Sequence, residues 1–115
     1  MQHRLVMFAA CIAAGLLGAA PVMAQAPADP AVRRVAKLLS FSMAATLCEA
    51  PLSVAVQTKL DAALDTAFLM QKTITLENIG DVTAAMGAKF MENEASNCAQ
   101  FKDLDVSAAI DEAVK

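Results

Sequence analysis

The chain has 115 residues, with nine basic side chains, twelve acidic ones and a single histidine, His3. Residues 25–115 keep eight of the basic residues (nine minus Arg4) and all twelve acidic ones, a net charge of −4. Nucleic-acid binding needs a basic face to neutralise phosphates, so this balance disfavours that partner. Residues 25–115 contain no His, Trp or Tyr, which excludes histidine-based catalysis and histidine-ligated metal. We expect no enzymatic activity, no cofactor and no metal.

Residues 1–24 form a predicted secretory signal peptide. Arg4 provides a basic start, residues 5–24 carry no charged side chain, and small residues precede the predicted cleavage point. This order of basic, apolar and small residues is typical of an exported protein. We predict cleavage after Ala24, with Ala26 as the alternative, and a periplasmic or secreted location. Cys11 would leave with the signal.

An uncleaved membrane anchor is the competing interpretation of this segment, because about 20 apolar residues can span a bilayer. Gly15, Gly18 and Pro21, near the predicted cleavage point, favour removal, so no stable anchor is expected. Residues 25–28 are then a flexible lead-in, and residues 29–115 form one domain.

The first helix of this domain is predicted from Asp29-Pro30 to about Cys48. Asp29 can cap it, and proline is favoured at the first helical position. The helix ends before Pro51, since the residue before proline is disfavoured in a helix. Apolar residues recur at steps of three and four and share one face: Val32, Val35, Leu39, Met43 and Leu47.

Three basic residues, Arg33, Arg34 and Lys37, lie off this apolar stripe. They indicate a solvated face, with a patch for anionic lipid as the alternative.

A second helix is predicted over residues 51–71. Its apolar stripe has steps of four and comprises Leu52, Val56, Leu60, Leu64 and either Ala67 or Phe68. Asp61 and Asp65 are also four residues apart and share a face. They indicate a solvated pair; an acid–base couple or half of a cation site is the alternative.

A third helix is predicted from Leu76 to about Ala95, with Thr75 as its cap. Ile74 and Ile79 have the spacing of a hydrophobic staple. The residues expected to point inward are Ile79, Val82, Met86 and Phe90. Glycine costs about 1 kcal/mol relative to alanine inside a helix, so the surface formed by Gly80, Ala84 and Gly87 indicates close approach of another helix. A hinge or a ligand groove is the alternative.

After the polar residues 93–97 and Cys98, Phe101 and Leu104 are expected to return to the core. Asp105 can cap a short last helix, in which Val106, Ile110 and Val114 face inward. No segment alternates long enough to predict a strand. The predicted fold is all-α, a small antiparallel bundle of three longer helices and a short C-terminal one.

Cys48 and Cys98 are predicted to form a disulfide, because paired cysteines in a small exported domain usually join. The bond would close a long loop and stabilise the fold by about 4 kcal/mol in the loop-entropy model. A redox-active pair or a metal site competes with this interpretation. Redox pairs usually have the spacing Cys-x-x-Cys, and two thiols without histidine make a poor zinc site.

An exported, acidic, four-helix domain with one long-range disulfide resembles the periplasmic acid-stress chaperones of the HdeA/HdeB type. The local features that carry this resemblance are Cys48-Glu49 and Asn97-Cys98. The chain departs from those chaperones in lacking tryptophan and in having only Lys102 and Lys115 after Cys98. The resemblance implies capture of unfolded proteins at low pH.

A pH response without histidine depends on carboxylates, whose ordinary pKa is near 4. If the fold lowers those pKa values, the stability gained at neutral pH is lost as pH falls through the lowered values. Loosening would then expose an apolar binding surface that includes Met43, Met86 and Phe90. A protein partner is therefore expected. The alternatives are a specific inhibitor or immunity-type module, and a small lipid binder with an opening lined by Gly80 and Gly87.

Overall fold

The computed structural model describes residues 29–115; the predicted signal peptide and the lead-in at 25–28 lie outside the described residues. Within residues 29–115 the chain forms five α-helices and no strand, which confirms the all-α class. The helices are α3 (Pro30–Leu47), α4 (Val54–Leu69), α5 (Ile79–Met91), α6 (Glu94–Lys102) and α7 (Val106–Ala113).

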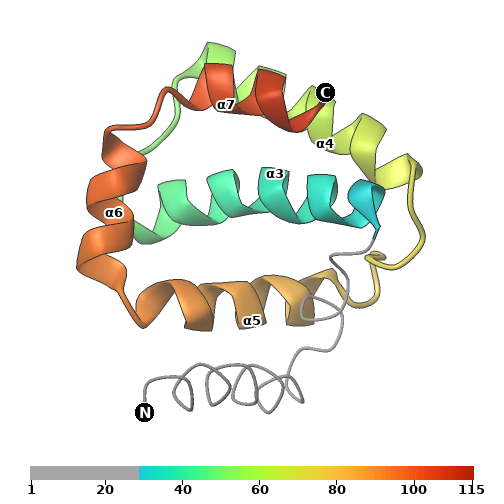
Figure 1. Cartoon of the computed structure of the whole chain (residues 1–115), viewed down its shortest axis with the longest axis horizontal. Helices are drawn as coiled ribbons and strands as arrows, with labels where there is room; N and C mark the ends of the chain where they lie inside the picture. The colour runs from blue at the N-terminus through green and yellow to red at the C-terminus, as the bar shows by residue number, and fades with distance from the viewer. Residues whose placement is uncertain (1–28) are drawn as a thin grey trace, which may run out of the picture.

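Helix α3 lies at the centre of the fold and contacts each of the other four helices. In Figure 1, α4 and α7 lie on one side of α3 and α5 lies on the other. α4 and α7 run antiparallel to α3, whereas α5 runs in the same direction as α3. The second and third predicted helices therefore do not fold back on each other as a hairpin; they flank the first one.

The central position of α3 explains why its buried face is wider than the predicted stripe. Its buried residues are Val32, Val35, Ala36, Leu38, Phe41 and Ala44. Leu39, Met43 and Leu47, which the spacing also placed inward, are only half-buried. A helix covered on two sides needs apolar residues on both, which a single-stripe pattern underestimates. The predicted start is confirmed, because the Asp29 carboxylate accepts a hydrogen bond from the Ala31 amide at 2.9 Å.

Helix α4 begins three residues later than predicted. Ser53 caps it, its hydroxyl oxygen accepting from the Val56 amide at 3.2 Å. Within the predicted stripe Leu60 and Ala67 are fully buried. Leu52, Val56, Leu64 and Phe68 are half-buried and pack against the same core.

The connection between α4 and α5 is organised by the buried side-chain amide of Gln71. Its Nε2 donates to the carbonyl oxygens of Phe68 and Ile74, at 3.0 and 2.9 Å. Its Oε1 accepts from the Ile74 amide at 2.7 Å. The side chain thus replaces backbone partners that an irregular segment lacks, and it holds Ile74 in the core.

Thr75 was predicted to cap the third helix, but α5 begins at Ile79 and Asn78 holds its N-cap position; Thr75 lies at the start of the turn before it. Thr75 Oγ1 accepts from the Asn78 amide at 3.3 Å, and Asn78 Oδ1 accepts from the Thr75 amide at 2.8 Å. This reciprocal pair is a capping box with asparagine in place of the usual Glu or Gln. Ile74 and Ile79 both join the core, in keeping with the predicted staple.

The prediction of one helix from Leu76 to about Ala95 is wrong. α5 ends at Met91, and the polar segment after it forms the separate helix α6, which contains Cys98. The side-chain amide of Asn97 donates to the Phe90 carbonyl oxygen at 2.8 Å, satisfying one of the free carbonyl groups at the end of α5. The chain can therefore turn between two helices, an effect that spacing alone does not reveal.

The C-terminal predictions are partly confirmed. Phe101 is buried, and the Asp105 carboxylate caps α7 by accepting from the Ala108 amide at 3.0 Å. Ile110 is fully buried, but Leu104 and Val114, both expected inside, are 42% and 44% exposed. Leu104 lies in the connection between α6 and α7, and α7 ends before Val114.

Replacing Gln71 by alanine should lower the free energy of unfolding by about 2 kcal/mol, because it leaves buried backbone groups of Ile74 without partners. Urea denaturation measures the change. Gln100→Ala is the matched control, since Gln100 is exposed on α6; its effect should stay below about 0.5 kcal/mol. Equal effects of the two substitutions would contradict the role given to Gln71.

Candidate functional site

The predicted disulfide between Cys48 and Cys98 is confirmed, with the two Cα atoms 5.5 Å apart. Cys48 is buried at the end of α3, where its amide donates to the Ala44 carbonyl oxygen at 2.8 Å. Cys98 is half-buried in α6. The bond joins the central helix to the C-terminal part of the chain.

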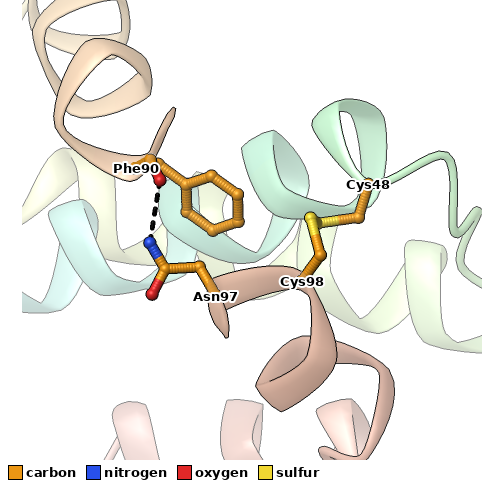
Figure 2. Close-up of a disulfide and its surroundings, with 4 residues drawn as sticks. All are labelled: Cys48, Phe90, Asn97 and Cys98. Atoms are coloured by element: carbon orange, nitrogen blue, oxygen red, sulfur yellow. Dashed lines mark hydrogen bonds between the residues drawn. A yellow bond between two sulfur atoms is a disulfide. The ribbon is translucent and has the colours of Figure 1, made fainter. Parts of the chain in front are cut away.

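The disulfide joins the C-terminal end of α3 to the middle of α6. Figure 2 shows the Asn97 amide bonded to the Phe90 carbonyl oxygen, and the ring of Phe90 pointing toward the disulfide. The C-terminal end of α5 is therefore fixed by a polar contact beside a covalent one. The polar contact joins α5 to α6; within residues 29–115 no side-chain hydrogen bond or ion pair joins α5 to α3.

The residue after Cys48 has an unusual backbone conformation. Glu49 has φ of 51°, in the left-handed region. Its amide donates to Thr46 O at 3.2 Å, and the Ala50 amide donates to Ala45 O at 2.9 Å. These two bonds form a Schellman motif, in which the left-handed position is usually glycine. A residue with a Cβ pays about 1–2 kcal/mol in this conformation.

The predicted apolar surface lies at the interface between α3 and α5. Met43, Met86 and Phe90 are all half-buried, and the latter two pack against the core. A Cβ placed on Gly87 would be 3.8 Å from Met43 Sδ and 4.0 Å from Leu47 Cδ1. Gly87 of α5 therefore lies against Met43 and Leu47 of α3.

Of the three small residues predicted to allow close approach of another helix, Gly80, Ala84 and Gly87, only Gly87 lies against one. Gly87 faces Met43 and Leu47, whereas a Cβ on Gly80 would meet nothing within 4 Å. Ala84 is exposed. A helix contact thus accounts for Gly87 alone, and nothing in the contacts of Gly80 explains its presence.

The two carboxylates of the Asp61–Asp65 pair are exposed on α4. Asp61 Oδ1 accepts from Gln57 Nε2 at 2.9 Å, a contact within the same helix. Across residues 29–115 no three Cys, Asp or Glu side chains gather closely enough to hold a metal ion. The geometry favours a solvated pair.

The basic residues of α3 divide into two kinds. Arg33 and Lys37 are exposed, and Lys37 Nζ lies 5.9 Å from the centre of the Phe41 ring. Arg34, predicted to be solvated, instead donates from Nε to the Ala113 carbonyl oxygen at 3.1 Å. A cation here satisfies a free carbonyl at the end of α7.

Helix α7 is also attached to α4, through Lys59. The Lys59 ammonium lies 2.8 Å from Asp111 Oδ1 and donates to Ser107 Oγ at 2.9 Å and to the Ser107 carbonyl oxygen at 3.3 Å. Sequence spacing did not identify this cluster, because the two helices are far apart along the chain.

A cleft of about 370 Å³ lies between the α3–α4 connection and the α6–α7 connection, with the first turns of α4 and α7 at its sides. Sequence analysis missed it, since it forms only when the two connections come together. Its walls are Ala50, Pro51, Leu52, Ser53, Val56, Phe101, Lys102, Leu104, Asp105, Val106 and Ser107.

Other exposed apolar side chains lie around the α4–α5 connection. Leu69 and Leu76 are 84% and 82% exposed, and Met70 lies between them in the sequence and is also exposed. In Figure 1 this connection is at the opposite end of the molecule from the α6–α7 connection.

Comparison of the chain with protein-family models, with curated proteins and with solved structures finds no match. Among the helices of residues 29–115, none combines the length and the hydropathy needed to cross a membrane.

Replacing both Cys48 and Cys98 by serine should lower the free energy of unfolding by about 2–4 kcal/mol, because the unfolded chain loses a cross-link that closes a long loop. Urea denaturation of the oxidised protein and of the double variant measures the difference. Reductant should destabilise the former and leave the latter unchanged. A double variant as stable as the oxidised protein would contradict this role.

Proposed function

We propose that this chain is an exported binding protein that holds apolar segments of unfolded proteins, acting as a small chaperone under acid conditions. The observation that carries the proposal is that α5 buries few side chains and contacts α3 through a methionine-containing interface beside the disulfide. Export follows from the predicted signal peptide at residues 1–24, and a disulfide is compatible with an oxidising compartment. No catalytic step belongs to this proposal.

Helix α5 is the long helix with the least burial. Only Val82 of α5 is buried, whereas α3 has six buried residues. Full burial of one such side chain contributes about 1.5–3 kcal/mol, so separating α5 from α3 costs far less than separating α3 from the rest of the core. Local opening begins at elements of this kind.

Separation of α5 would uncover the predicted binding surface on both helices. Met86 and Phe90 would be freed on α5, and Met43 on α3. Methionine is flexible and polarisable, so it adapts to unrelated apolar partners. The disulfide would keep the opened chain compact, since it still ties the end of α3 to α6.

Acid is the proposed trigger. All twelve carboxylates and eight of the basic residues lie within residues 29–115, so full protonation moves the net charge from −4 to +8. Full protonation neutralises the carboxylates and leaves the basic groups to repel one another.

The trigger weakens the whole domain, and α5 is the element expected to leave first. Helix α7 keeps contacts that need no carboxylate, from Arg34 to Ala113 and from Lys59 to Ser107. Acid-induced loosening followed by client capture is also what the resemblance in layout to the HdeA/HdeB-type chaperones implies. That resemblance is part of the proposal.

The purified, oxidised protein should suppress aggregation of an acid-sensitive client at pH 3 and lack this effect at pH 7. Met86→Gln should require several-fold more protein for the same protection, because the client contact loses about 1 kcal/mol of apolar transfer free energy. Light scattering measures client aggregation. Met70→Gln is the matched control, since Met70 is exposed in the closed fold, and should behave as the original protein.

Equal protection by the two variants would remove the α3–α5 interface from the proposal. Absence of any protection at pH 3 would contradict the chaperone function itself. A lipid that co-purifies with the protein, detected by mass spectrometry, would favour the lipid-binding alternative.

A further inference from the structure

We propose that Met43 is a site of reversible oxidation, at which a hydroperoxide separates α5 from α3 at neutral pH. Conversion of the Met43 thioether to a sulfoxide places a polar group in the interface between the two helices. This second trigger rests on the proposed function only for what the opened interface then does. The opening of α5 itself is measured without any client.

Methionine is the side chain that a peroxide attacks in residues 25–115. These residues contain no His, Trp or Tyr, and their two cysteines are joined in the Cys48–Cys98 disulfide. The thioether sulfur gives up two electrons and gains one oxygen, while the O–O bond of the peroxide breaks and its other oxygen leaves as water. Methionine sulfoxide is reduced back by enzymes, so the change is reversible. The methionines of these residues are Met43, Met70, Met86 and Met91.

The four methionines differ in what their oxidation disturbs. Met70 and Met91 are 64% and 44% exposed, so a sulfoxide at either position stays in water. Met43 and Met86 are half-buried; a small oxidant reaches them, but part of each side chain is covered. A sulfoxide is polar where the thioether was apolar, and methionine-containing interfaces are disrupted by this change. Only the half-buried pair can therefore act on the fold.

The sulfur of Met43 lies against α5 at a position that has no side chain. A Cβ placed on Gly87 would be 3.8 Å from Met43 Sδ. Packed interfaces have little free space, so an oxygen added to this sulfur forces its neighbours to move. Within residues 29–115 no side-chain hydrogen bond joins α5 to α3, so the closed interface is not built around a polar group. Water is the partner of the sulfoxide oxygen, and it gains access when α5 moves away.

Helix α5 can respond because few contacts hold it. Val82 is its one buried residue, and its C-terminal end is attached to α6 through the hydrogen bond from Asn97 to Phe90. Separation from α3 uncovers Leu47, which also faces Gly87, and the ring of Phe90. A peroxide leaves these two apolar side chains unchanged, so they remain able to contact a client after Met43 is oxidised.

The test treats the disulfide-bonded protein with hydrogen peroxide at pH 7 and follows two quantities in the same samples. Mass spectrometry of proteolytic fragments gives the extent of sulfoxide at each methionine, and amide hydrogen exchange gives the protection of α5 (Ile79–Met91). Met70 and Met91 should be oxidised first, with α5 still protected. Exchange in α5 should then become at least about tenfold faster as Met43 is oxidised.

Met43→Leu is the decisive variant, because leucine has a similar volume and no sulfur to oxidise. Its α5 should exchange within about twofold of the untreated variant after the same treatment. Met91→Leu is the matched control, since Met91 is an exposed residue of α5, and it should lose protection as the original protein does. Met86→Leu leaves Met43 as the one methionine of the interface and should also lose protection.

An α5 that stays protected after Met43 is fully oxidised would overturn the proposal, and so would failure of the peroxide to oxidise Met43. Opening that is complete when only Met70 and Met91 carry sulfoxide, or equal opening of the treated Met43→Leu variant, would overturn it too.

Light scattering of a client at pH 7 separates this proposal from the chaperone function. The peroxide-opened Met86→Leu variant should suppress aggregation of the client. Opening without suppression would support the oxidation site and count against the chaperone function. Client protection at pH 3 together with a closed α5 after peroxide would support the chaperone function and overturn the oxidation site.

Discussion

The bond between Cys48 and Cys98 is the constraint on which the rest of the structure depends. It joins the end of the central helix α3 to α6 across 50 residues of sequence, so everything between its two ends forms one closed loop. Restricting that loop in the unfolded chain is worth about 4 kcal/mol in the loop-entropy model. This is a large share of the roughly 5–15 kcal/mol by which a typical domain is stable. With that contribution from the disulfide, the domain can be stable although only α3 is well buried.

Two separate surfaces follow from this arrangement. Beside the disulfide, α5 contacts α3 through half-buried side chains and shares no polar contact with it, so this interface is able to open. On the other side of Cys48, the left-handed Glu49 directs the chain into the α3–α4 connection, which forms one wall of the cleft. The first surface depends on loosening of the fold, whereas the second depends on the fold being intact.

Sequence patterns predicted the features that depend on neighbouring residues. The caps at Asp29 and Asp105 and the cysteine pair were found in this way. The patterns failed where a structural feature depends on contacts that a helical repeat does not encode. The break between α5 and α6 involves the hydrogen bond from Asn97 to Phe90. Helix α7 is held in place by Arg34 and Lys59, which belong to other helices. The cleft needs two connections to meet in space, and one-dimensional periodicity carries no signal for that.

Amide hydrogen exchange of the oxidised protein at pH 7 and pH 3, followed residue by residue by NMR, tests the central claim most directly. The claim is that α5 separates from a core that the disulfide keeps together. It predicts that protection factors in α5 (Ile79–Met91) fall at pH 3 while those in α3 remain high. Simultaneous loss of protection in all helices, or an α5 as protected at pH 3 as at pH 7, would contradict it.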